Sequence, residues 1–238
     1  NRTMTTQLLG FDSMDYNVVY AQMGRGKNER NVAFALAGIA GTIAKLAFDA
    51  CMFNSQNFGF VKLPDECTTG SSIMPHKKNP DVFELIRARC NRLQALPSQI
   101  VLMMNNLPCG YFRDLQEIKE VFLPAFDQLL DCLEMTTYIV DRMKVNEHIL
   151  DDARYDAMFS VEEVNTLAAN GMPFRDAYKK VGLDIEAGKF TPNKDIHHTH
   201  EGSIGNLCNA EIAALMEQTY SRFGFARVEA AERKLLEV

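Results

Sequence analysis

The chain has 238 residues, of which 47% are hydrophobic, and its formal net charge is −6. This length and apolar fraction suffice for one large hydrophobic core with a small additional domain. The acidic balance argues against nucleic acid as a partner, because phosphate binding needs a broad basic surface.

The first predicted helix covers residues 30–54, which lack proline and are apolar on nearly all sides, as in the middle of a bundle. Its apolar run at residues 32–44 is shorter than the roughly 20 residues that cross a bilayer, so we expect a buried helix. The first residue is Asn1 rather than methionine, and we expect further sequence upstream.

Two more long helices are predicted. The second begins at Asn79, a good N-cap, with Pro80 at the first helical position, and it ends before the Leu-Pro pair at residues 107–108. The third covers residues 114–143, and Pro124 within it predicts a kink. After residue 146 the segments become shorter and richer in glycine and proline. The pattern indicates an all-α fold, with a central helical bundle over residues 1–146 and a small helical domain over 147–238.

Six cysteines occur, and no two have the Cys-x-x-Cys spacing of zinc or redox motifs. Several lie in apolar stretches, where a thiol acts as a small core residue. Reduced cysteines of this kind indicate a cytoplasmic protein.

Between the first two helices, residues 68–80 read Thr-Thr-Gly-Ser-Ser-Ile-Met-Pro-His-Lys-Lys-Asn-Pro. Two serine hydroxyls, Lys77 and Lys78 come together here with the start of a helix, whose free N–H groups favour anions. The segment therefore predicts a site for a small anion, with a carboxylate as the natural ligand. The alternative interpretation is a polar interhelical loop with a helix cap.

Residues 70–80 resemble the signature Gly-Ser-Ser-x-Met-Pro-x-Lys-x-Asn-Pro of the fumarase/aspartase superfamily at every fixed position. Members of this superfamily break a C–N or C–O bond in succinyl compounds and release fumarate. The resemblance implies a long-helix bundle and a reaction through a doubly negative aci-carboxylate, which needs preorganised donors and cations. It implies no cofactor and no metal.

The resemblance also implies roles for individual residues. Ser71 is the expected catalytic base, and Ser72 the expected ligand of the substrate carboxylate. Lys77 and Asn79 are expected to stabilise the aci-carboxylate. A serine is a weak base, so Ser71 must be activated by Lys77, by loop N–H groups and by exclusion of water when the loop closes, for which Gly70 gives freedom.

Two nearby residues carry further expectations. Glu84, one turn into the second helix, matches a carboxylate that pairs with a histidine from the upstream half of these enzymes, and we count it among the catalytic residues. His76 stands where many relatives have glutamine. A proton-transfer role is one interpretation of His76, and a solvated loop side chain is the favoured one.

Three further segments resemble the argininosuccinate lyases within the superfamily. Residues 84–87 read Glu-Leu-Ile-Arg, residues 107–120 read Leu-Pro-Cys-Gly-Tyr-Phe-Arg-Asp-Leu-Gln-Glu-Ile-Lys-Glu, and residues 171–178 read Gly-Met-Pro-Phe-Arg-Asp-Ala-Tyr. The second segment departs from the family at Phe112 and Ile118, where asparagine and aspartate are usual.

Within the second segment the resemblance implies substrate contacts by Tyr111, Gln116 and Lys119. A phenol and an amide can orient a polar substrate, and an ammonium can bind a carboxylate. Gln116 and Lys119 are three residues apart and can share one helix face. The alternative is an ordinary polar helix start.

Two other segments remain without a role. Residues 24–31 lie where the family has Ser-x-Arg-Asp, and their register is ambiguous, so nothing is assigned to Arg25, Lys27 or Arg30. Residues 197–200 read His-His-Thr-His, which could suggest a metal site. A clustered polar loop is the favoured interpretation, because the superfamily reaction needs no metal.

Taken over the whole chain, the resemblance implies cleavage of argininosuccinate to arginine and fumarate by a homotetramer whose active sites are shared between subunits. Neither a membrane nor a nucleic acid is an expected partner. The family's chain is roughly twice this length, so we expect this half to be inactive alone. The alternatives are another fumarate-releasing lyase such as adenylosuccinate lyase, a recruited crystallin-like structural homologue, and a helical adaptor.

Overall fold

The computed structural model describes residues 1–237 and confirms the all-α class, with strands of only two residues each in this range. Two units are distinguished by their internal contacts: Asp15–Glu147, and Asn1–Met14 together with the residues from His148 onward. Residues 1–14 group with the C-terminal unit because Arg227 binds the Gly10 carbonyl and the Asp12 carboxylate. The predicted boundary after residue 146 stays a prediction.

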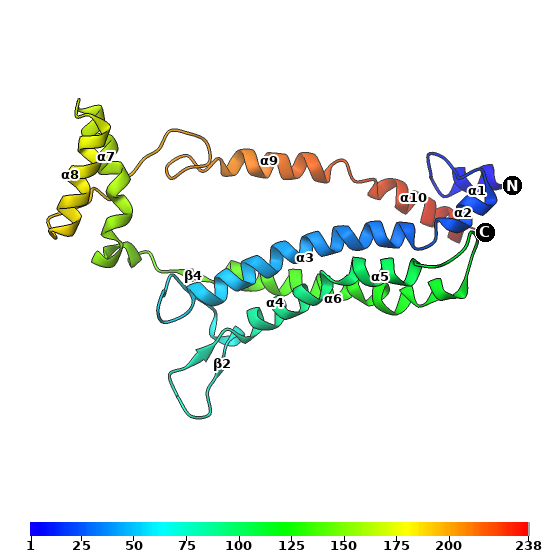
Figure 1. Ribbon diagram of the computed structural model, residues 1–238. Coiled ribbons are helices and arrows are strands. Elements are labelled where there is room, and N and C mark those ends of the chain that lie inside the picture. Colours follow the sequence, from blue (N-terminus) through cyan, green and yellow to red (C-terminus); the bar gives the residue numbers. More distant parts are fainter. Residues whose placement is uncertain (238) are drawn as a thin grey trace. The chain divides into compact units, whose positions relative to one another are not determined.

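The first unit is a bundle of long helices (Figure 1). A short helix, α2 (Val18–Met23), precedes α3 (Lys27–Phe53), which packs along α4 (Asp81–Leu93), α5 (Leu96–Met104) and α6 (Ile118–Arg142). Helix α6 runs back along the bundle in the direction opposite to α4 and α5 (Figure 1).

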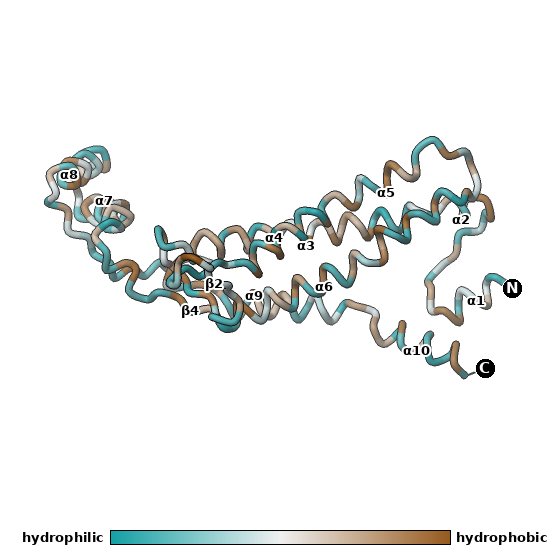
Figure 2. The backbone as a smooth tube through the Cα atoms, turned by 90° about the horizontal axis from the view of Figure 1, so that it is seen from below, coloured by the Kyte–Doolittle hydropathy of each residue, from teal (hydrophilic) through white to brown (hydrophobic). Residues whose placement is uncertain are grey.

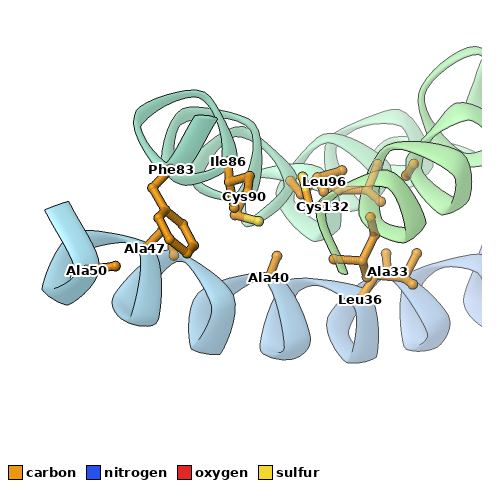
Figure 3. Packing of buried hydrophobic residues seen from close by; sticks show 14 of the residues in the cluster. Ala33, Leu36, Ala40, Ala47, Ala50, Phe83, Ile86, Cys90, Leu96 and Cys132 are labelled. Atoms are coloured by element: carbon orange, nitrogen blue, oxygen red, sulfur yellow. The ribbon is translucent and has the colours of Figure 1, made fainter. Parts of the chain in front are cut away.

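Helix α3 packs through a narrow stripe of small residues. Its buried positions recur every three or four residues and are alanines with one leucine: Ala33, Leu36, Ala40, Ala44, Ala47 and Ala50. Figure 3 shows this stripe facing Phe83, Ile86 and Cys90 of α4. Small side chains allow the helix backbones to approach closely, and the helical spacing keeps the stripe on one face.

One predicted helix is divided in two. A continuous helix from residue 79 to 106 was expected, but the helix is interrupted at Gln94 and Ala95, between α4 and α5. Pro97 explains the break, because it has no N–H to donate to the Leu93 carbonyl and its ring clashes with that carbonyl.

Helix α6 continues through Pro124, and a 3-10 turn, η2 (Arg113–Gln116), precedes it. Phe126 is 37% exposed, whereas the buried positions of the helix recur every three or four residues after the first turns: Ile118, Ala125, Leu129, Cys132, Thr136 and Ile139.

Two short antiparallel ribbons lie beside the bundle helices. Strand β1 (Val61–Lys62) pairs with β4 (Lys144–Val145), and β2 (Thr69–Gly70) pairs with β3 (Lys78–Asn79). A 3-10 turn, η1 (Asp65–Cys67), connects β1 to β2. The second ribbon carries the predicted anion-binding segment at its tip (Figure 1).

The other unit contains α1 (Arg2–Leu8), the 3-10 turns η3 (Ile149–Asp151) and η4 (Ala153–Phe159), and four further helices. Of these, α7 (Ser160–Ala169) and α8 (Phe174–Glu186) form a pair around buried Val164, Ala177 and Val181. The last two helices are α9 (Asn209–Tyr220) and α10 (Phe225–Leu236).

The segment Val18–Phe53 is, by length and composition alone, apolar enough to cross a membrane. The expectation that this region is too short was therefore too strict, since it considered only residues 32–44. The same test is passed by core helices of water-soluble bundles. Because α3 packs along α4, α5 and α6, its packing is that of a bundle helix.

Candidate active site

The signature segment forms a small hairpin. Thr69 pairs with Asn79 and Gly70 with Lys78, which leaves residues 71–77 as a mostly exposed tip. The prediction that Asn79 caps the second helix is wrong, because Asn79 lies in β3 and α4 begins at Asp81. A residue before proline favours extended backbone, so Pro80 keeps Asn79 in the ribbon.

The Ser71 hydroxyl is held by the loop backbone. Its Oγ accepts hydrogen bonds from the N–H groups of Ile73 and Met74, both at 3.2 Å. Ser71 is half-buried, whereas Ser72 is exposed. Two N–H donors thus point at this oxygen, as in the local turns that serine side chains form with the residues that follow them.

The two lysines of the loop have different surroundings. The exposed Lys77 donates its backbone N–H to the Met74 carbonyl at 3.1 Å, and its ammonium has no partner among residues 1–237. Lys78 instead binds the carboxylate of Asp65. The hydrogen bond and the charge of Lys78 lower the pKa of Asp65 below its ordinary value. Lys77 is thus the free cation of the pair.

A second polar contact joins the two sides of the hairpin base, because the Thr69 hydroxyl donates to the Asp81 carboxylate. Both this contact and the Lys78–Asp65 pair were missed from the sequence. No local pattern in the sequence relates Asp65 or Asp81 to the loop.

Glu84 and His76 are both exposed. Glu84 lies in the first turns of α4, and its side chain has no hydrogen bond or ion pair within the described chain. Its carboxylate is therefore available to a partner from outside this chain segment.

Tyr111, Gln116 and Lys119 form a second polar group. Gln116 donates to the Tyr111 hydroxyl at 3.3 Å, and Lys119 follows in the first turn of α6. This group and the signature hairpin lie at opposite ends of the bundle (Figure 1). A helix of the length of α6 spans about 37 Å, so a single chain does not bring the two groups together.

Residues 24–31 lead into α3. Arg25 pairs with Glu29 at 2.8 Å, and Glu29 also accepts the N–H of Gly26 at 2.8 Å, which satisfies a free donor at the helix start. A cavity of about 390 Å³ lies beside them, lined in part by Asn28 and Phe122. The local contacts of Arg25 and Glu29 are those of a helix start.

The histidine-rich loop is tied to α7. His198 lies 2.6 Å from the Ser203 hydroxyl through Nδ1 and 3.0 Å from the Glu162 carboxylate through Nε2. His197 pairs with Asp195 at 2.9 Å. Over residues 1–237, no three His, Cys, Asp or Glu side chains are grouped to hold a metal ion. These histidines bind neighbouring side chains instead.

The fold and the hairpin agree with a known class of enzymes. Residues 21–95 match the model of a lyase family. The chain is similar to an argininosuccinate lyase from Bacteroides thetaiotaomicron, with 78% identity over 99% of this chain and 53% of that protein. A second argininosuccinate lyase, from Stenotrophomonas maltophilia, is 39% identical over 90% of this chain and 50% of its own length. The chain thus spans about half the length of the curated relatives it matches.

Solved structures show the same fold. An EDDS lyase in complex with formate superposes with a TM-score of 0.67 at 24% identity, covering 79% of this chain and 38% of its own. A class II fumarase from Schistosoma mansoni superposes with a TM-score of 0.62 at 16% identity, covering 94% of this chain and 42% of its own. At these identities the likeness concerns the fold alone.

Proposed function

We propose that this chain is the C-terminal part of an argininosuccinate lyase, an enzyme that cleaves a carbon–nitrogen bond in argininosuccinate and releases fumarate and arginine. The observation that carries the proposal is the Ser71 hydroxyl, which accepts hydrogen bonds from two loop N–H groups in the same exposed loop as Lys77. The similarity to two argininosuccinate lyases supports the choice of substrate.

The reaction needs no oxidant or second substrate. Ser71 takes the proton from the carbon next to a substrate carboxylate, and the electron pair moves into that carboxylate as an aci-carboxylate. Lys77, Asn79 and Ser72 stabilise the added negative charge. The pair then returns to form the carbon–carbon double bond of fumarate, the C–N bond breaks, and the departing guanidino nitrogen takes up a proton to complete arginine.

The active site is proposed to be shared between chains. The Ser71 hairpin and the Tyr111–Lys119 group are too far apart to touch one small substrate within one chain. Antiparallel association of two bundles would bring one end of one chain to the opposite end of another. Glu84 would then meet its histidine partner from another part of the assembled enzyme.

The bundle surface supports such association. Along α3, large apolar side chains remain 39–59% exposed on the faces outside the alanine stripe: Val32, Phe34, Ile39, Leu46 and Phe48. Figure 2 shows hydrophobic residues along the whole length of the bundle helices. Exposed apolar surface of this extent marks an interface, and a homotetramer with a shared central bundle is our proposal. All six cysteines are free, as suits the cytoplasm.

The test is fumarate release by the complete polypeptide that contains this chain. Argininosuccinate is the substrate, adenylosuccinate is the control substrate, and a Ser71→Ala variant is assayed in parallel. We expect release from argininosuccinate only, and a fall in kcat of at least about a thousandfold in the variant.

Release from adenylosuccinate alone would keep the lyase reaction and overturn the choice of substrate. Release from neither would favour a recruited structural homologue. Full activity of Ser71→Ala would remove Ser71 as the base.

A further inference from the structure

The signature hairpin has little backbone pairing to hold it. Within residues 1–237 the ribbon has two residue pairs, Thr69–Asn79 and Gly70–Lys78, and a two-stranded ribbon of this size is marginal in water. Residues 71–77, including Ser71 and Lys77, extend beyond these two pairs. Something else must fix where the tip lies and which way its side chains point.

Two side-chain contacts cross the base of the hairpin. Asp65, before β2, binds Lys78 in β3, and Asp81, after β3, accepts from Thr69 in β2. Each contact joins the segment that enters the loop to the segment that leaves it. Each is also polar and exposed, with the Lys78 and Asp65 side chains 49% and 66% accessible, so its effect is on position more than on global stability.

Register matters here because the two lysines are adjacent. Lys77 directly precedes β3, so a slip of one residue would bring Lys77 to the place of Lys78 and move Lys78 to the place of Asn79. The Asp65 carboxylate holds Lys78 on one face. Lys77, with no carboxylate of its own, is left for the substrate.

Asp65 is suited to this task by its surroundings. The positive charges of Lys62 and Lys144, which are register partners in the β1–β4 ribbon, act on it in addition to Lys78. Like charges directly opposite one another destabilise a ribbon, and the Asp65 carboxylate offsets them. Asp65 thereby connects the hairpin to the end of the bundle.

We propose that Asp65 and Asp81 are positioning residues of the active site: through Lys78 and Thr69 they clamp the base of the hairpin and fix Lys77 as the lysine presented to the substrate. The proposal rests on the proposed function of Ser71 and Lys77. Neither aspartate touches the reacting atoms.

The experiment uses the complete enzyme with the variants Asp65→Asn, Asp81→Asn and Lys78→Met. The matched control is Asp141→Asn, because Asp141 is an exposed carboxylate that pairs with its neighbour Arg142. The readouts are kcat and KM for argininosuccinate, and hydrogen exchange of the backbone N–H groups in residues 71–77 other than Pro75. In each clamp variant we expect kcat to fall about fivefold and tip exchange to rise by a similar factor. In Asp141→Asn both should stay within about twofold of wild type.

The conservative variant Asp65→Glu keeps a carboxylate for Lys78 and a negative charge near Lys62 and Lys144. Values of kcat and of tip exchange nearer to wild type in Asp65→Glu than in Asp65→Asn support the clamp. Unchanged kcat and exchange in both aspartate variants would overturn it. So would near-complete loss of activity in Lys78→Met alone, because Lys78 would then contact the substrate. If the wild type itself releases no fumarate, the proposed function fails, while hydrogen exchange still decides whether the clamp exists.

Discussion

The helical bundle and the signature hairpin are held together by different forces. The bundle buries Phe83, Ile100 and Ile139 completely, and its position is set by close packing. The hairpin tip buries almost nothing; two backbone pairs and two side-chain contacts hold its base, and short-range hydrogen bonds such as those to Ser71 Oγ hold the loop itself. The bundle is therefore held in place by packing within one chain, whereas the groups proposed for catalysis are exposed, and in the proposed enzyme they complete their site with groups from other chains.

The two adjacent lysines give the sharpest test of this view. We expect Lys77→Met to lower kcat by about a hundred- to a thousandfold, because it removes a charge that stabilises the transition state. Lys78→Met should lower kcat only about fivefold, because Lys78 binds Asp65 and in this proposal does not contact the substrate. Steady-state kinetics of the complete enzyme measure both, and equal losses would mean that the two lysines do not differ in role.

Mixed assemblies test whether the exposed groups of separate chains meet. Ser71→Ala and Lys119→Met enzymes are each expected to be nearly inactive. Subunits that have been mixed in equal amounts, dissociated and reassociated should regain about one quarter of the sites if Ser71 and Lys119 of one site come from different chains. No recovery in demonstrably mixed oligomers would show that one chain supplies both.

The packing of the helical bundle is tested by shortening a buried side chain. Phe83→Ala should lower the free energy of unfolding by about 3–5 kcal/mol, because Phe83 is fully buried against α3 and leaves a cavity. Arg89→Ala, on the same helix and exposed, should change it by less than about 0.5 kcal/mol. Urea unfolding measures both, and a small effect of Phe83→Ala would mean that the core refills the space.

A smaller effect is expected from alkaline pH. Burial, with a contribution from Cys132, raises the pKa of Cys90 from 9.0 to about 12. The unfolded thiol ionises near 9.0 and the folded one does not, so its contribution to stability is complete below pH 9 and is lost as pH rises toward 12. Between pH 9 and 11 the free energy of unfolding of the wild type should therefore fall by roughly 1–3 kcal/mol more than that of the Cys90→Ala variant.

The control for the thiol is Cys109→Ala, because Cys109 is exposed. Its free energy of unfolding should follow the wild-type pH dependence. If Cys90→Ala also follows it, the Cys90 thiol has no role in alkaline destabilisation.

Much of the scaffold was predictable from the sequence because helix formation leaves a local, periodic trace. The prediction for residues 30–54 agrees closely with α3, which spans Lys27–Phe53. The break before Pro97 was missed, although proline in a helix has a known local effect. The N-cap at Asn79 was wrong because a local capping preference yielded to strand pairing with Thr69.

The sequence by itself determined the class of the fold and the resemblance to a family of lyases, because an ordered signature and apolar periodicity are properties of neighbouring residues. Only the tertiary structure decided which lysine is free, that Asp65 and Asp81 close the hairpin, and that Tyr111 and Lys119 lie at the far end of the bundle. The physical reason is that these relations depend on which distant segments of the chain pack beside one another. Spacing along the sequence carries no record of that choice.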